Sequence, residues 1–140
     1  MSQVIREDNR IIIPSSLEFL REVEEYVEEK LKAKKLSQDL LADIAISVTE
    51  VVTNAVCHGN QNDAGKKVYV SVTVRPRQVQ VSVTDEGAGF DPAQLPNPTE
   101  EQNLLKDAGR GIFIVKSLMD EVKFEARPQG GTTITLVKNF

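Results

Sequence analysis

A stretch near the middle of the chain carries residue types that could bind a metal ion and activate a nucleophile. It reads Glu50-Val-Val-Thr-Asn54-Ala-Val-Cys-His58-Gly-Asn. Glu50, Asn54 and His58 follow one another at intervals of one helical turn, so on an α-helix they share a face. A carboxylate there can accept a proton while the amide oxygen coordinates Mg²⁺, which prefers oxygen ligands and retains waters and substrate phosphates. The alternative is a solvated helix face.

A second candidate group, Asp85, follows the alternating valines Val79, Val81 and Val83. Because Asp85 also stands at an odd position, its side chain points to the core side at the end of this strand. A carboxylate there needs a hydrogen-bond partner. The exocyclic amino group of adenine is one such partner, and a turn-capping role is the alternative. Gly87 and Gly89 allow positive φ or a close approach of the backbone to a planar ligand.

A third glycine-containing segment precedes a predicted helix. Gly109-Arg110-Gly111 comes just before an apolar pattern that predicts a helix from about Gly111 to Met119. Helix N-termini offer free N–H groups and the positive end of a dipole, so phosphates bind there. Arg110 could add positive charge, although a surface arginine is the simpler interpretation. The late Gly130-Gly-Thr-Thr run is typical of a hairpin turn.

The elements that must position these residues follow from periodicity. Ser15 and Glu18 form a capping-box pattern before a predicted helix over 17–31. Ser37 is expected to cap a second helix that ends near Gly59. Alternation or apolar runs predict strands at 11–13, 68–74, 79–83, 122–126 and 134–136, with an irregular segment at 91–108. The order predicts an α+β fold, a two-layer α/β sandwich whose mixed, mostly antiparallel sheet carries helices on one face.

The composition limits the class of protein. With 140 residues, 40% hydrophobic and 27% charged, the chain suits one soluble domain over 1–140. A net charge of -4 argues against non-specific binding to nucleic acid or to an anionic membrane. The single cysteine, Cys57, cannot form an internal disulfide, and the polar N-terminus lacks a signal peptide's apolar core. We therefore expect a cytoplasmic protein.

Several other chemistries fit poorly. One histidine and one cysteine cannot build the usual zinc sites. A Cys–His hydrolase is disfavoured because adjacent helical residues face apart. The glycine pattern matches neither the Walker A loop nor the glycine-rich loop of protein kinases.

Taken together, the four segments resemble the ATPase superfamily (GHKL) shared by DNA gyrase, histidine kinases and mismatch-repair ATPases. The Glu-x-x-x-Asn, Asp-x-Gly-x-Gly, Gly-x-Gly and late Gly-Thr motifs occur in that family's order and span nearly the whole chain. The closest likeness is to bacterial anti-sigma-factor serine/threonine kinases. It rests on residues 50–59 and on Ser-Leu-Met-Asp-Glu-Val at 117–122.

The resemblance implies a Bergerat-type fold and a set of site residues. Glu50 would be the general base, Asn54 would hold Mg²⁺, and Asp85 would bind the adenine amino group of ATP. Segment 91–108 would be the ATP lid. Further nucleotide contacts would come from His58, Gly87, Gly89, Gly109, Arg110, Gly111, Ile112, Thr132 and Thr133.

The resemblance also implies a function. Such a kinase is an anti-sigma factor in a partner-switching system, is commonly a homodimer, and phosphorylates a STAS-type anti-anti-sigma protein. The unphosphorylated antagonist strips the kinase from its sigma factor. The alternative is a non-catalytic ATP/ADP-binding module that sequesters a sigma factor or other regulator, although such a binder needs no base like Glu50. A histidine kinase is disfavoured because the sole histidine, His58, lies inside the nucleotide motif, and a gyrase-type ATPase because the chain has no room for a transducer domain.

Overall fold

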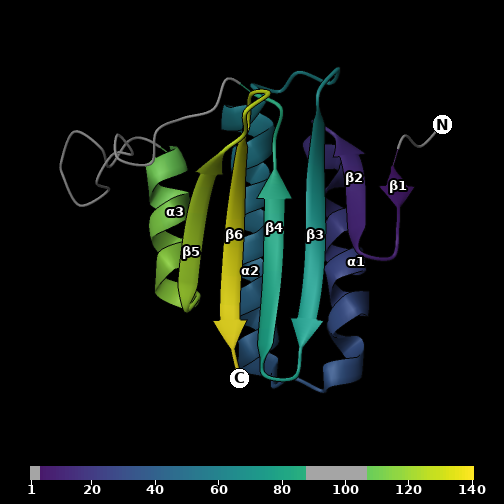
Figure 1. Cartoon of the computed structure of the whole chain (residues 1–140), viewed down its shortest axis with the longest axis vertical. Coiled ribbons are helices and arrows are strands. Elements are labelled where there is room, and N and C mark those ends of the chain that lie inside the picture. The colour runs from purple at the N-terminus through teal and green to yellow at the C-terminus, as the bar shows by residue number, and fades with distance from the viewer. Residues whose placement is uncertain (1–3, 88–106) are drawn as a thin grey trace.

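The fold has two layers, a β-sheet and a set of helices on one of its faces (Figure 1). The computed structural model describes residues 4–87 and 107–140, with side chains in the second segment described from Arg110 onward. Over these residues the opposite face of the sheet carries no helix. The predicted α+β two-layer sandwich is therefore confirmed.

The sheet has six strands in the order β1-β2-β3-β4-β6-β5. Their bounds are Ile5–Arg6 (β1), Arg10–Pro14 (β2), Lys67–Arg75 (β3), Gln78–Thr84 (β4), Glu121–Ala126 (β5) and Thr132–Asn139 (β6). Every neighbouring pair is antiparallel, so in the described part of the chain the sheet is antiparallel throughout rather than mixed. The sequence analysis missed β1, because two exposed residues leave no periodic pattern. The order places β4 beside β6, which are far apart in the sequence.

The first helix begins later than predicted and has a different cap. A short 3₁₀ turn, Leu17–Phe19, leads into α1, Leu20–Leu31. The Ser16 hydroxyl accepts a hydrogen bond from Glu18 N at 3.4 Å, so Ser16, not Ser15, caps the turn. Ser15 is instead buried, and its hydroxyl accepts a hydrogen bond from the side chain of Asn60.

The second helix matches its prediction at its start and has an irregular end. Ser37 caps α2, Gln38–Asn54, by accepting a hydrogen bond from Leu40 N at 3.2 Å. The helix then widens into a π-helical turn, Ala55–Gly59, in which Asn60 N donates to Ala55 O at 2.8 Å. A hydrogen bond that spans five residues adds a residue to the turn. The helix nevertheless ends at Gly59, as predicted.

The helical segment Gln38–Gly59 is long and apolar enough, by length and composition alone, to cross a membrane. Ile44, Val48, Val51 and Val52 of this segment are buried in the core of the domain. Core helices of this kind meet the same test of length and composition.

The third helix begins earlier than predicted. It spans Asp107–Leu118 as α3, so Gly109, Arg110 and Gly111 lie within its first turns rather than before it. Glycine lowers helix propensity by about 1 kcal/mol relative to alanine, which is why the sequence pattern placed the start after these residues. Packing against α2 overrides this preference.

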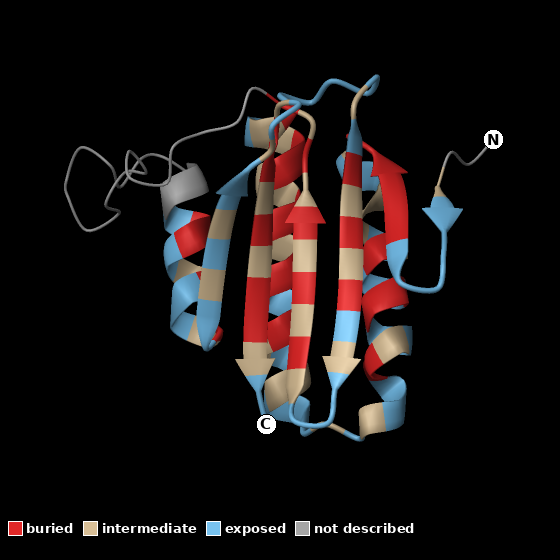
Figure 2. Cartoon of the chain, viewed as in Figure 1, coloured by how far each residue is buried: buried red, intermediate tan, exposed pale blue. Residues whose placement is uncertain are grey.

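The core lies between the helices and the sheet. Along β3 and β4 buried and less buried residues alternate, as the banding in Figure 2 shows. Val70, Val81 and Leu136 are fully buried on the helix-facing side. Burying one such side chain contributes about 1.5–3 kcal/mol, so the alternation fixes which face of each strand points to the helices.

Candidate functional site

The carboxylate of Asp85 lies buried at the end of β4. Its side chain follows the inward parity of the preceding valines and is 4% exposed. Oδ1 accepts hydrogen bonds from Gly87 N at 2.9 Å and from Thr132 N at 3.3 Å. Burial raises the pKa of Asp85, and these N–H groups partly oppose the rise. A carboxylate held in this way presents a fixed acceptor to a ligand.

The two threonines of β6 lie on opposite faces of the sheet. Thr132 is 1% exposed, and its carbonyl accepts a hydrogen bond from Asp85 N at 3.0 Å. Its Oγ1 is buried without a hydrogen-bond partner among the described residues. The Thr133 side chain points to the opposite face of the strand, where its hydroxyl lies 2.9 Å from the hydroxyl of Thr84. The orphaned hydroxyl beside the carboxylate therefore favours Thr132 over Thr133 as a ligand contact.

Glycines allow three backbone segments to meet at Asp85. A Cβ on Gly59 would clash with the Asp85 carboxylate, and a Cβ on Gly87 would clash with the carbonyl of Gly59. Gly131 has φ +98°, and a Cβ there would clash with the Asp85 carbonyl. The end of α2, the turn after β4 and the start of β6 thus close around one carboxylate. The sequence analysis read Gly59 as a helix stop and gave it no place beside Asp85.

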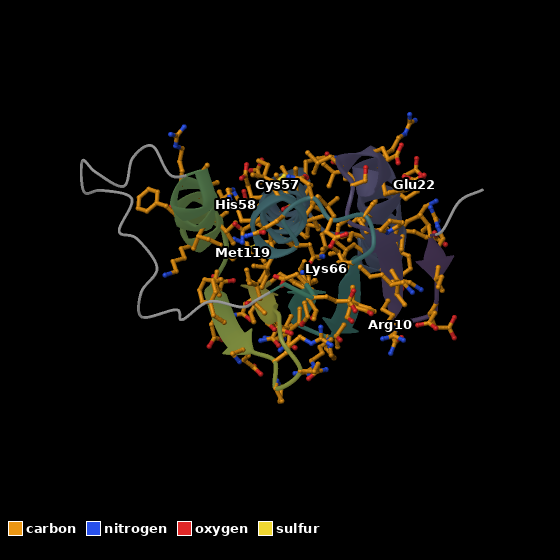
Figure 3. The ribbon with its side chains drawn as sticks, turned by 90° about the horizontal axis from the view of Figure 1, so that it is seen from above. Arg10, Glu22, Cys57, His58, Lys66 and Met119 are labelled. Atoms are coloured by element: carbon orange, nitrogen blue, oxygen red, sulfur yellow. The ribbon has the colours of Figure 1, made fainter. Side chains whose placement is uncertain are left out.

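The helix α2 carries Glu50 and Asn54 at half-buried positions one turn apart, as predicted. His58 is exposed and lies in the π-helical turn with Cys57, both labelled in Figure 3. The extra residue in this turn changes the rotation that regular helical spacing would give His58. The structure therefore holds Glu50 and Asn54 on one helical turn, and His58 follows in a differently wound one.

Two buried oxygens on this helix, Ser47 Oγ and Asn54 Oδ1, lack a hydrogen-bond partner among the described residues. Asn54 Oδ1 is the one that lies one turn from Glu50. Leaving a buried acceptor unpaired costs about 1–3 kcal/mol, so such an atom is expected to meet a ligand or an ion. No group of three or more His, Cys, Asp or Glu side chains that could hold a metal occurs in residues 4–87 or 110–140. A metal here would need other ligands.

The start of α3 lies against Glu50. A Cβ on Gly111 would come within 2.8 Å of Glu50 Oε2, so the glycine leaves room for this carboxylate. Arg110 is exposed, whereas Ile112 is 3% exposed and belongs to the core. Gly109 lies in the helical backbone. Gly89 and residues 91–106 of the expected lid lie outside the described residues.

Glu50 also borders a groove on the side of α1. This groove, of about 620 Å³, lies between α1 and α2, and Glu50 is part of its lining. The other lining residues include Val27, Leu31, Leu41, Ala45 and Ile46. Glu50 therefore lines a surface groove, while its carboxylate lies against Gly111 of α3.

A buried asparagine outside the predicted site residues links the end of α2 to the sheet. Asn60 is 0% exposed, and its Nδ2 donates to Ser15 Oγ and to Lys67 O, the latter at 3.0 Å. Its Oδ1 accepts from Glu86 N at 2.8 Å. An asparagine after a helix-ending glycine is typical of an exposed turn, so only the tertiary structure shows its role.

Comparison with known proteins identifies the family of the chain. A family model described as "Histidine kinase-like ATPase domain" matches residues 13–138. The anti-sigma F factor of Bacillus subtilis is 37% identical over 107 residues, which cover 74% of this chain and 73% of that protein. The anti-sigma F factor of Geobacillus thermodenitrificans is 38% identical over 105 residues, or 73% of this chain and 71% of that protein.

Two solved structures share the fold. The crystal structure of the RsbU and RsbW domains of Rv1364c from Mycobacterium tuberculosis aligns with a TM-score of 0.61 at 24% identity, over 93% of this chain and 32% of that one. The chain thus spans about a third of that longer protein. The mycobacterial sensor histidine kinase MprB aligns with a TM-score of 0.58 at 18% identity, over 86% and 93%. The match over residues 13–138 shows that this chain belongs to the histidine kinase-like ATPase family.

Proposed function

We propose that this chain is an ATP-dependent serine/threonine protein kinase that also acts as an anti-sigma factor in a partner-switching system. One observation carries the proposal: the Glu50 carboxylate and the unpaired, buried Oδ1 of Asn54 lie one turn apart on a helix whose end closes on Asp85. A base and an oxygen ligand for a metal ion serve phosphoryl transfer from ATP, and a buried acceptor can hold the adenine. The similarity to anti-sigma F factors supports the regulatory half of the proposal.

Three groups would hold the nucleotide. The exocyclic amino group of adenine would donate to Asp85, next to the orphaned Thr132 hydroxyl. The phosphates would lie at the start of α3, near Gly109 and Gly111. The N–H groups of the first turn of a helix have no intrahelical acceptor and can bind phosphate oxygens. Both N–H groups that donate to Asp85 bind its Oδ1, so Oδ2 is the oxygen that would accept from the adenine amino group.

Asn54 fits a magnesium site that has a single ligand from the protein. Its buried Oδ1 supplies one oxygen ligand, and Mg²⁺ commonly takes its remaining ligands from water and substrate phosphates. When bound, the ion would neutralise charge on the phosphates. The absence of an acidic cluster among the described side chains is compatible with that arrangement.

The proposed step uses Glu50 as the base. Its carboxylate accepts the proton of a serine or threonine hydroxyl from a partner protein. The hydroxyl oxygen then forms a bond to the γ-phosphorus, the bond to the β–γ bridging oxygen breaks, and ADP leaves. Glu50 lines the surface groove between α1 and α2, and this position beside a groove supports a protein substrate.

The proposed partners follow from the same system. They are a sigma factor, a STAS-type antagonist that receives the phosphoryl group, and a second copy of the chain in a homodimer. The setting is the cytoplasm. The similarity to anti-sigma F factors supports the sigma factor among these partners.

The test is transfer of label from γ-labelled ATP to a STAS-type protein in the presence of Mg²⁺. We expect acid-stable label on the acceptor from the wild type. Glu50→Gln should retain ATP binding and lose about 10²–10⁴-fold in transfer rate, the usual contribution of a general base. The matched control is Glu29→Gln, which makes the same change at an exposed position on α1.

Each outcome discriminates between functions. Equal transfer by Glu50→Gln and the wild type would remove Glu50 from the role of base. ATP binding without any label on the acceptor would replace the kinase by a nucleotide-dependent binding module.

A further inference from the structure

The turn that carries Asp85 is held from two sides by side chains outside the nucleotide motifs. Arg127, in the loop between β5 and β6, donates from Nη1 to Asp85 O at 3.0 Å. Glu86 N donates to the buried Asn60 Oδ1 at 2.8 Å. The carbonyl before the turn and the amide within it are therefore both fixed by side chains.

The Glu86 carboxylate fastens the same turn to β3. Its Oε1 accepts from Lys67 N at 2.6 Å, and its Oε2 accepts from the Tyr69 hydroxyl at 3.0 Å. The Tyr69 phenol is a donor at neutral pH, and burial, followed by the hydrogen bond to Glu86, raises its pKa further. Both oxygens of a half-buried carboxylate are thus committed to one strand.

Two arginines lie over the ring of Tyr69, and they differ in one contact. The Arg127 guanidinium is 6.0 Å from the ring centroid and the Arg10 guanidinium is 5.7 Å from it. Arg10, labelled in Figure 3, is paired with Glu7. Arg127 alone of the two donates to the Asp85 carbonyl. Arg10 therefore provides a matched control for loss of the charge and of the ring contact.

The direction of Asp85 Oδ2 depends on this turn. Oδ1 is fixed by Gly87 N and Thr132 N, and Gly87 belongs to the turn that Glu86 and Arg127 hold. A hydrogen bond weakens steeply when its angle departs from linear, so a small rotation of the turn would misalign the remaining oxygen. We propose that Glu86 and Arg127 are positioning residues that aim Asp85 at the 6-amino group of a purine and so give the site its preference for adenine. This inference rests on the proposed function, since it assumes that Asp85 meets the base.

The experiment compares the dissociation constants of ATP and ITP by calorimetry. ITP carries a carbonyl where ATP carries the 6-amino group, so it cannot donate to Asp85. We expect the wild type to prefer ATP by at least about tenfold, because one charge-assisted hydrogen bond is gained and a repulsion is avoided. Glu86→Ala and Arg127→Ala should each bring the ITP/ATP ratio of dissociation constants about tenfold closer to one, mainly by weakening ATP.

Conservative variants separate positioning from general stability. Glu86→Gln can accept from Lys67 N and donate to the Tyr69 oxygen, so it should retain the wild-type ratio. Arg10→Ala should also retain it. A purely structural role for Glu86 would weaken ATP and ITP equally and leave the ratio unchanged, which would overturn the proposal.

Tyr69→Phe and Asp85→Asn provide two further tests. If an alanine variant does not fold, Tyr69→Phe decides, because it keeps the ring and removes one bond to Glu86. We expect it to reduce the ratio about threefold, and an unchanged ratio would refute the proposal. If the wild type binds no ATP, or if Asp85→Asn keeps the wild-type ratio, the nucleotide assignment itself fails. If Asp85→Asn changes the ratio but the Glu86 and Arg127 variants keep it, the nucleotide assignment stands and only the positioning role of these two residues fails.

Discussion

At the scale of single residues, Asp85 combines burial with a carboxylate that forms no salt bridge to the described residues. Its carboxylate accepts two backbone N–H groups and no side-chain donor in the described part of the chain. We expect Asp85→Asn to weaken ATP binding by about ten- to a hundredfold, because a hydrogen bond to a charged acceptor contributes about 1.5–3 kcal/mol. Calorimetry would measure the loss, with Glu121→Gln, an exposed change at the far end of β5, as control. Equal affinity would refute the adenine contact.

The same substitution should stabilise the free protein in a pH-dependent way. Burial raises the pKa of Asp85 above its ordinary value of 3.8. Between the unfolded-state and folded-state pKa the folded protein binds more protons, so its stability falls as pH rises through this window. The Asp85→Asn variant has no such carboxyl group, so its stability should not fall in this way. We therefore expect the difference in free energy of unfolding between the variant and the wild type to grow from about pH 4 toward neutral pH.

Urea unfolding without nucleotide at several pH values would measure this advantage. A constant difference between variant and wild type across that range would contradict the prediction. Together with weaker ATP binding, the result would indicate that the charge is kept for its ligand at a cost in stability.

At the scale of elements, the hairpin between β5 and β6 reaches its geometry through two glycines with positive φ. Gly130 has φ +100° and Gly131 has φ +98°, but only a Cβ at Gly131 would clash with the backbone of Asp85. We expect Gly130→Ala to cost about 1 kcal/mol, the conformational term alone. Gly131→Ala should cost more than about 2 kcal/mol and weaken ATP binding as well. Denaturant unfolding would measure both, and equal costs would show that the approach to Asp85 does not matter.

The elements predicted from sequence were those with strong local signals. Alternating valines gave β3 and β4, and Ser37 gave the start of α2, because periodicity and capping are local properties. Local patterns failed where packing decides. Two glycines hid the start of α3, and Ser15 was read as a cap although its hydroxyl bonds to Asn60.

At the scale of the whole molecule, one lysine joins the two layers at the end away from Asp85. Lys138 of β6 lies 3.3 Å from Asp43 of α2, and its Nζ also donates to the carbonyl of Leu118 at the end of α3. The two charged side chains are 16% and 32% exposed. We expect Lys138→Met to lower the free energy of unfolding by about 1–2 kcal/mol. Lys123→Met is the control, since its pair with Glu121 is exposed and should contribute no more than about 0.5 kcal/mol.

The candidate site was predicted in its parts but not in its assembly. The sequence placed Glu50 and Asn54 one turn apart and turned Asp85 inward, since both follow from the periods of helix and strand. It could not show that β4 lies beside β6, or that Gly59, Gly131 and Arg127 would converge on the turn after β4. Those contacts join distant segments, and no local pattern encodes them.

The π-helical turn at the end of α2 fixes the place of Gly59 but leaves the length of the chain before it adjustable. Ala55–Gly59 contains one residue more than a regular turn, and Gly59 then meets Asp85 without a Cβ. Deleting one residue between Ala55 and Gly59 would turn the hydrogen bond from Asn60 N to Ala55 O into a regular α-helical one, because a π-helical turn is an α-helical turn with one residue inserted. Gly59 would then still face the carboxylate, and Asn60 would keep its hydrogen bonds to Lys67 O and Glu86 N. Homologous chains should therefore lose one residue before Gly59 more readily than they replace Gly59 itself.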